Sequence, residues 1–203
     1  MKLLFNTASP FSRKARILAH EMALGDALEP IDTGLIPPVK PNAEVIAVNP
    51  IGKVPVLLLD DGRCLSDSRV ICEYLDDVGA GGFFPAAADE RYTALHIQAL
   101  VDDLLNTAVA TRYELAYRPA GTLWEEWVEK QKMRISRTLD YFETCLPLFA
   151  GRATIGEVAV ACALGYVDFR DLDPQWSDRN GGLARWYADY ARGPAMQATW
   201  PSS

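Results

Sequence analysis

A short polar stretch near the amino terminus combines hydroxyl groups with positive charge. Ser9 and Ser12 flank a Pro-Phe pair, and Arg13, Lys14 and Arg16 follow at once. The proline suits the first position of a helix, with Ser9 as its N-cap. A hydroxyl at a helix start can hydrogen-bond an anion, whereas the positive end of the helix dipole disfavours cations there. The three cations therefore either serve an anionic ligand or are solvated surface charges.

The elements that would position these residues alternate between strand and helix in the first part of the chain. Residue patterns predict strands at 2–6 and 27–32, a hairpin at 54–65, helices at 10–25 and 66–79, and a loop at 33–42. We expect Gly25 to end the first helix. Pro30 cannot donate a ladder hydrogen bond, so its strand is expected at a sheet edge. Asp67 and Ser68 open the second helix as a typical N-cap sequence.

The pattern changes after residue 78. A segment rich in Gly, Ala and Pro at 79–88 predicts a linker, and helices are then predicted at 89–117, 123–146, 154–170 and 181–192. Thr154 and Glu157 form a capping box ahead of an apolar run, which indicates a buried central helix. The sequence therefore predicts a mixed α/β domain at 1–78, a linker at 79–88 and an all-helical domain at 89–203.

Composition limits the classes of function. The chain has 203 residues and a formal net charge of −7, and an acidic chain repels nucleic acid phosphates. None of the four cysteines (Cys64, Cys72, Cys145 and Cys162) belongs to a Cys-x-x-Cys pair, and two histidines offer no zinc-ligand spacing, so no metal is expected. The last three cysteines are expected to be buried thiols in a reducing compartment. No apolar run suggests a signal peptide or membrane span, which favours a cytoplasmic protein that binds neither nucleic acid nor membrane.

The most specific motif lies between residues 49 and 75. It reads Asn-Pro-Ile-Gly-Lys-Val-Pro-Val-Leu at 49–57, Asp-Ser at 67–68 and Ile-Cys-Glu-Tyr-Leu at 71–75. This pattern resembles the glutathione-binding half of the glutathione transferase superfamily. The resemblance covers the whole chain and implies a thioredoxin-like α/β domain followed by an all-α domain. Within the superfamily the chain is most similar to small bacterial transferases with Ser-Pro-Phe-x-Arg-Lys near the amino terminus.

The resemblance implies how glutathione would bind. It implies a cis bond between Val54 and Pro55, which would let the Val54 backbone pair with the tripeptide as an added strand does. Ser68 and the helix N–H groups would bind the γ-glutamyl carboxylate, and Asp67 the neighbouring ammonium. The family usually carries the longer Glu or Gln in place of Asp67. Lys53 would either meet the glycyl carboxylate or be solvated.

The resemblance also gives Ser9 a chemical role. In thioredoxin-like redox proteins the first helix begins with Cys-x-x-Cys, and serines at both positions here exclude dithiol exchange. Ser9 matches the catalytic serine of Ser-type transferases by position, whereas Ser12 lies further into the helix. A hydrogen bond from Ser9 would favour the thiolate of glutathione, whose free thiol has a pKa of about 8.5. Glutathione is thus a co-substrate, and no permanently bound cofactor is implied.

The expected residues around glutathione and its acceptor include several aromatic side chains. The candidates are Phe11, Ile36, Arg112, Tyr113 and Tyr117. Asp102 and Asp103 either face the glutathione ammonium or form a solvated acidic surface.

The resemblance implies a homodimeric transferase that conjugates glutathione to a small hydrophobic electrophile. An alternative is a glutathione-binding regulatory or interaction module with little activity, since fold alone does not fix function. A glutathione-linked reductase would need a cysteine at residue 9 or 12, and the sequence has none there.

Overall fold

A four-stranded sheet organises the amino-terminal part of the chain in the computed structural model, which describes residues 1–25, 27–40 and 42–202. The strands are β1 (Lys2–Phe5), β2 (Glu29–Asp32), β3 (Val56–Leu58) and β4 (Cys64–Leu65), in the order β2-β1-β3-β4. The β1–β2 pair is parallel, whereas β1–β3 and β3–β4 are antiparallel. Pro30 lies on the edge strand β2, as predicted.

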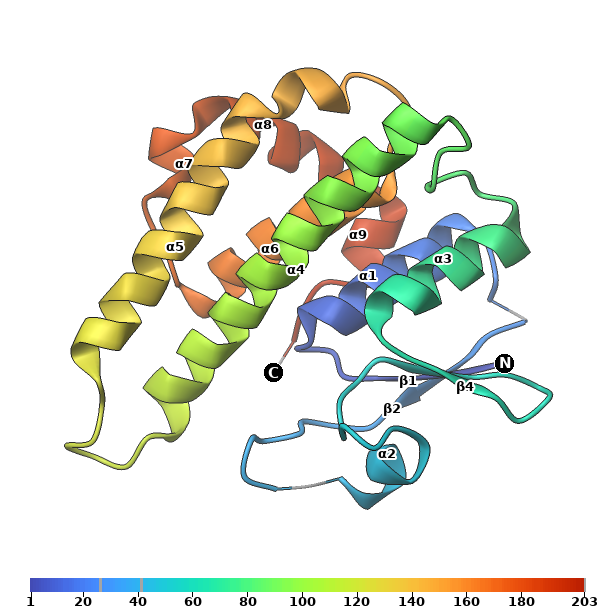
Figure 1. Cartoon of the computed structure of the whole chain (residues 1–203), viewed down its shortest axis with the longest axis horizontal. Helices are drawn as coiled ribbons and strands as arrows, with labels where there is room; N and C mark the ends of the chain where they lie inside the picture. Colours follow the sequence, from blue (N-terminus) through green and yellow to red (C-terminus); the bar gives the residue numbers. More distant parts are fainter. Residues whose placement is uncertain (26, 41, 203) are drawn as a thin grey trace. The chain divides into compact units, whose positions relative to one another are not determined.

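Helices cover both faces of this sheet. Leu4 pairs with Val56, and both pack against Val45 of the short helix α2 (Ala43–Val48), which the sequence analysis did not assign. Helices α1 (Pro10–Glu21) and α3 (Ser68–Gly79) pack side by side on the opposite face (Figure 1). The α/β part thus has the predicted thioredoxin-like layers.

The end of α1 differs from the prediction, which placed it at Gly25. The helix ends at Glu21, and Ala23 adopts a left-handed φ of 51°. The Ala23 N–H donates to the carbonyl oxygen of His20 at 3.0 Å, and the Leu24 N–H donates to that of Ala19 at 3.1 Å. This is a Schellman ending built on alanine rather than glycine, so the expected glycine signal appears two residues too late.

The rest of the chain is helical. Its elements are α4 (Ala88–Tyr117), α5 (Glu125–Thr144), the 3-10 turn η1 (Leu146–Phe149), α6 (Ile155–Arg170), α7 (Trp176–Arg179), α8 (Gly181–Tyr190) and α9 (Pro194–Ala198). The predicted capping box on α6 is confirmed, because Glu157 Oε2 accepts from the Thr154 N–H at 2.8 Å and Thr154 Oγ1 from the Gly156 N–H at 3.1 Å. Every residue from Ile155 to Val167 is buried, so α6 forms the predicted central helix.

The chain divides into two units, Met1–Arg91 with Gly193–Ser203 and Tyr92–Arg192. The last residues thus belong with the first unit, where α9 packs against α1, although the sequence analysis assigned them to the helical domain. The segment 80–87 between α3 and α4 is held by Asp76, whose carboxylate accepts from the Phe83 and Phe84 N–H groups at 2.8 and 3.0 Å. Among the described residues, no helix combines the length and apolar character needed to cross a membrane.

Candidate functional site

Ser9 stands at the N-cap of α1, between the end of β1 and the first helical turn. Its Oγ accepts a hydrogen bond from the Ser12 N–H at 3.2 Å, so its own proton is not used in this contact. Ser9 is half-buried, whereas Ser12 is fully buried and its Oγ accepts from the Asn6 N–H at 3.4 Å. The geometry therefore leaves Ser9 as the hydroxyl that a ligand at this helix start can reach.

The loop before β3 presents the backbone of Val54. The Val54–Pro55 bond is cis, which confirms the expectation from the motif. In the described chain, neither the Val54 N–H nor its carbonyl oxygen bonds to another residue, so both can pair with an extended peptide. The Lys53 side chain is exposed, and its role toward a glycyl carboxylate stays a prediction.

Asn49 is a positioning residue for this loop that the sequence analysis quoted only as part of the motif. It is 6% exposed, and its Nδ2 donates to the carbonyl oxygen of Lys53 at 2.8 Å. Its Oδ1 accepts from the Ile51 N–H at 3.2 Å. Asn49 therefore crosses the loop and fixes the approach to Val54, and an amide is needed because it must donate and accept at once.

The start of α3 offers a second place for an anion. Ser68 is 2% exposed, and its hydroxyl has no hydrogen-bond partner among the described residues. Asp67 caps the helix by accepting from the Arg69 N–H at 2.9 Å. Partial burial raises the pKa of the Asp67 carboxyl, but hydrogen bonds from Arg69 and the nearby charge of Lys14 outweigh this and hold the pKa below its ordinary value. Asp67 is thus an anion that already has Arg69 as a partner, at 2.9 Å between Nη2 and Oδ2.

Arg13 and Lys14 are buried, so the alternative that the cations of the first helix are solvated surface charges is wrong for these two residues. Arg13 is 2% exposed and Lys14 is 0% exposed. The Arg13 Nη2 donates to the carbonyl oxygen of Met196 at 3.2 Å, and its guanidinium lies 5.1 Å from the ring centroid of Trp200. The Arg16 Nη2 donates to the carbonyl oxygen of Ala198 at 3.4 Å.

These contacts give the two arginines a role that the sequence analysis did not consider. They bind carbonyl groups in the last turn of α9, where a helix leaves its acceptors without intrahelical partners. Burial lowers the pKa of Arg16, and the opposing charge of Asp32 limits that decrease. Lys14 differs from both, because its ammonium lies 5.9 Å from the ring centroid of Phe11 and its charge acts on Asp67. Only Lys14 of the three is thus directed toward the predicted glutathione residues.

The predicted acceptor residues divide between the two units. Phe11 and Ile36 belong to the first unit, where both are half-buried and Ile36 packs against the core around Val56. Arg112, Tyr113 and Tyr117 lie on α4 in the second unit.

The structure adds two residues of α6 to the α4 group. Tyr113 and Tyr117 form an edge-on ring pair with centroids 5.9 Å apart. Tyr166 is 4% exposed, and the Arg170 guanidinium lies 5.7 Å from its ring centroid. Burial raises the pKa of Tyr166, against the opposing influence of Arg170. The sequence analysis treated α6 as wholly structural, although the spacing of Tyr166 and Arg170, four residues apart, was a signal that they share a helix face.

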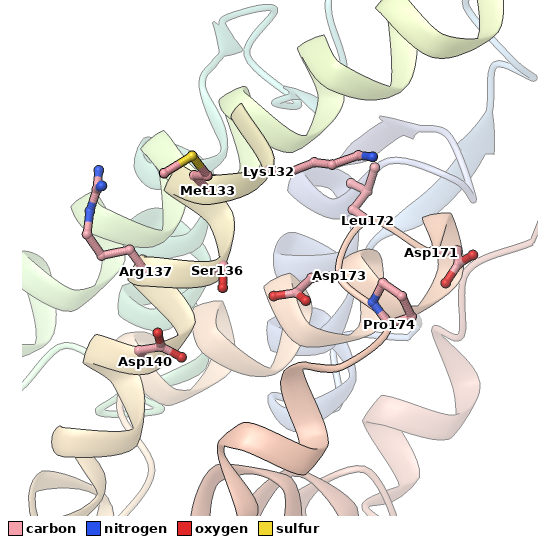
Figure 2. A pocket seen from close by; sticks show the side chains of 9 residues that line it. All are labelled: Lys132, Met133, Ser136, Arg137, Asp140, Asp171, Leu172, Asp173 and Pro174. Carbon is pink, nitrogen blue, oxygen red and sulfur yellow. The ribbon is translucent and has the colours of Figure 1, made fainter. Parts of the chain in front are cut away.

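Two further features lie outside the predicted site. Asp102 is 8% exposed while Asp103 is exposed, so the pair does not form one solvated acidic surface. A pocket in the helical unit lies between α5 and the segment after α6 (Figure 2). Its volume is about 670 Å³. None of its lining residues is a predicted site residue, and the Asp173 carboxylate there is paired with Arg179 at 2.7 Å.

The described residues hold no group of three or more His, Cys, Asp or Glu side chains arranged for a metal ion. Each of the four cysteines carries a thiol rather than a disulfide, and Cys64 is the exposed one. The predicted burial of Cys72, Cys145 and Cys162 is confirmed.

Comparison with known proteins identifies the class that this fold and site define. The amino-terminal and carboxyl-terminal domain models of glutathione S-transferases match residues 8–78 and 125–189. The uncharacterized GST-like protein YibF of Escherichia coli is 34% identical over 180 residues, covering 87% of this chain and 86% of that protein.

Solved structures agree with this assignment. A glutathione transferase family member from Pseudomonas fluorescens Pf-5 with bound glutathione is 38% identical, with a TM-score of 0.95 over 100% of this chain and 99% of that one. A second structure from the same organism, with bound S-(propanoic acid)-glutathione, is 37% identical, with a TM-score of 0.89 over 100% of both chains. The chain belongs to the glutathione S-transferase family and is an enzyme of the glutathione transferase class.

Proposed function

We propose that this enzyme binds glutathione in its first unit, ionises the thiol with Ser9 and joins the sulfur to a small electrophile. The observation that carries the proposal is the state of Ser9, which is partly accessible and has an unused hydroxyl proton at the positive end of a 12-residue helix. The bound glutathione in the Pseudomonas fluorescens relative supports the ligand.

Three groups would hold the tripeptide. The Val54 backbone would pair with the cysteinyl residue, and Ser68 with the start of α3 would take the γ-glutamyl carboxylate. Because the Ser68 hydroxyl has no partner among the described residues, a ligand carboxylate would satisfy it. Asp67 would bind the ammonium while keeping Arg69, since a carboxylate has enough lone pairs for both.

Ser9 would then act on the sulfur. A hydrogen bond from its hydroxyl favours the thiolate over the thiol, and the thiolate is the nucleophile. The thiolate attacks an electrophilic carbon, and the enzyme supplies ionisation and positioning. In the relative with a propanoic acid group on the glutathione sulfur, the bound molecule has the form of such a conjugate.

The test is the titration of the bound thiol. Thiolate absorbance of the glutathione complex, followed against pH, should give a pKa below that of free glutathione in the wild type. Ser9→Ala should raise it by about 1–2 units, because a hydrogen bond to a charged group contributes about 1.5–3 kcal/mol and one unit corresponds to about 1.4 kcal/mol.

Two variants control this experiment. Ser9→Thr keeps both the hydroxyl and the helix cap and should titrate like the wild type. Ser12→Ala removes a buried hydroxyl that faces Asn6 and should leave the thiol pKa unchanged. A wild-type complex that titrates like free glutathione would refute the catalytic role and favour the alternative of a binding module.

We also propose that the enzyme is a cytoplasmic homodimer. Light scattering of the purified protein measures its molecular mass in solution and so tests whether it is a dimer.

A further inference from the structure

The segment 6–9 links the end of β1 to the start of α1 and carries Ser9, and its first residue is Asn6. The Asn6 carbonyl oxygen accepts from the Ser9 N–H at 3.1 Å, and the Asn6 Oδ1 accepts from the Ala8 N–H at 2.7 Å. Pro10, which follows, has no N–H to donate. Asn6 therefore receives both N–H groups that immediately precede the helix, and it fixes the backbone that carries the Ser9 hydroxyl.

Asn6 also ties this segment to two other parts of the first unit. Its N–H donates at 3.4 Å to the Oγ of Ser12, which lies in the first turn of α1. Its Nδ2 donates at 2.8 Å to the carbonyl oxygen of Gly34, in the loop after β2. Gly34 has a left-handed φ of 67°, a conformation that glycine adopts without strain. The segment that carries Ser9 is thus anchored to the helix and to the loop after β2, and Asn6 makes both connections.

The amide of Asn6 matches these two side-chain contacts. Asn6 is 7% exposed, so water offers its partners little compensation if the contacts are lost. A carboxylate in its place would set a second acceptor against the carbonyl oxygen of Gly34. An apolar side chain would leave the buried Ala8 N–H without the oxygen that it binds. Asn6 is therefore suited to donate to one loop and to accept from the other at the same time.

The direction of the Ser9 hydroxyl decides how well it can bind a sulfur. The Ser9 Oγ accepts from the Ser12 N–H at 3.2 Å, which fixes one side of the oxygen and leaves its proton for a ligand. Hydrogen bonds weaken steeply as the donor departs from a straight line to the acceptor. A shift of the Ser9 backbone would therefore weaken the bond to a thiolate even though the hydroxyl is still present.

We propose that Asn6 is a positioning residue for the reaction, because it holds the Ser9 hydroxyl in the direction that hydrogen-bonds the sulfur of glutathione. This inference rests on the proposed function of Ser9 and adds a residue to its machinery. Asn6 acts through Ser9 and makes no contact with glutathione itself.

The thiolate absorbance of the glutathione complex, followed against pH, tests this role. Asn6→Ala removes both side-chain contacts and keeps Ser9. It should raise the pKa of the bound thiol by about 1 unit, because a misaligned hydroxyl forms a weaker hydrogen bond to the thiolate. Asn6→Ser should restore part of this shift, since a serine hydroxyl can accept from the N–H two residues further along the chain. Asn6→Ser also serves as the test variant if Asn6→Ala does not fold.

A double-mutant cycle separates positioning from a general structural role. If Asn6 acts through the Ser9 hydroxyl, Asn6→Ala should not raise the thiol pKa any further in a Ser9→Ala background. Asn180→Ala is the matched control, because Asn180 is 3% exposed and its Nδ2 donates to Asp140 Oδ1 at 2.9 Å in the helical unit. This control should lower the free energy of unfolding, as Asn6→Ala does, and leave the thiol pKa unchanged. Additive pKa shifts in the cycle, or an equal shift in Asn180→Ala, would overturn the positioning role.

Hydrogen exchange measures the hold of Asn6 on the segment 6–9 in the ligand-free protein. By NMR, the Ala8 amide proton should exchange about tenfold faster or more in Asn6→Ala than in the wild type, and at the wild-type rate in Asn180→Ala. Unchanged exchange in Asn6→Ala would overturn the positioning role.

The outcomes also separate this inference from the proposed function. If Ser9→Ala raises the thiol pKa and Asn6→Ala does not, this inference alone fails. If the wild-type complex titrates like free glutathione, the proposed function fails, and the positioning role fails with it.

Discussion

Replacing Arg13 tests how the carboxyl-terminal segment is held against α1. The side chain is 2% exposed, its Nη2 donates to the carbonyl oxygen of Met196 at 3.2 Å and to the Met196 Sδ at 4.0 Å, and its guanidinium makes a cation–π contact with Trp200. Its Nε and Nη1 are buried without a partner in the described chain. Arg13→Met keeps most of the aliphatic stem and removes the charge, whereas Arg13→Ala removes both.

The two substitutions should differ in free energy of unfolding. Losing the charged hydrogen bond costs about 1.5–3 kcal/mol and losing the ring contact about 1–2 kcal/mol. Against this, each of the two unsatisfied nitrogens costs the native state about 1–3 kcal/mol, and removing the charge relieves both. The contributions nearly cancel, so Arg13→Met should change the free energy of unfolding by no more than about 1 kcal/mol. Arg13→Ala leaves a cavity as well and should cost about 2–4 kcal/mol more.

Urea unfolding followed by tryptophan fluorescence measures both variants against the wild type. Arg16→Met provides the control, because this residue is only half-buried and its hydrogen bond to Ala198 is long, at 3.4 Å. Its guanidinium also lies 4.6 Å from the Phe5 ring centroid, so Arg16→Met should cost about 1 kcal/mol. If Arg13→Met destabilises as much as Arg13→Ala, the guanidinium contacts outweigh the unsatisfied nitrogens, and the reasoning from burial is wrong.

Three other changes have defined outcomes. Ser68→Ala should weaken glutathione binding about tenfold or more in calorimetry, because it removes a hydrogen bond to a charged group, and unchanged affinity would exclude Ser68 from the site. Thr154→Ala breaks the capping box of α6 and should lower the free energy of unfolding by about 1–2 kcal/mol without changing the thiol pKa; a loss within error would make the cap dispensable. The raised pKa of Tyr166 means that the unfolded chain ionises first, so its effect on stability is fully present below pH 10.0, its ordinary pKa, and declines as the pH rises further. Tyr166→Phe should therefore flatten the alkaline decrease in Tm, and a decrease as steep as that of the wild type would contradict the shift.

Local signals predicted the parts of the fold that neighbouring residues decide. The N-caps at Ser9 and Asp67, the capping box of Thr154 and Glu157, and the edge position of Pro30 all depend on contacts within a few residues. Such signals can be read from sequence because the partners lie within one or two turns.

The missed features depend on distant partners or on short segments. Helices α2, α7 and α9 have six, four and five residues, too few for a helical period to stand out. The burial of Arg13 depends on Met196, which is 183 positions away in the chain. The four-residue spacing of Tyr166 and Arg170 indicates that they share a face of α6, but the sequence does not say which neighbouring helix that face meets.

The electrostatics of the helix starts explain why the cations near Ser9 are compatible with a site for a thiolate. Helix α8 has no acidic residue in its first turn, and the Glu143 carboxylate from α5 takes that place by accepting from the Gly182 N–H at 3.1 Å. Helix α3 has the carboxylate of Asp67 as its N-cap, and helix α6 has Glu157 in its first turn.

Helix α1 has neither arrangement. Its first turn contains no acid, and its N-cap is the neutral side chain of Ser9. Arg13 and Arg16 belong to the binding of α9, so they add positive charge without bringing a counter-ion to the helix start. The positive end of α1 is therefore left for an anion from outside the chain, and a sulfur held at Ser9 would meet it as the thiolate.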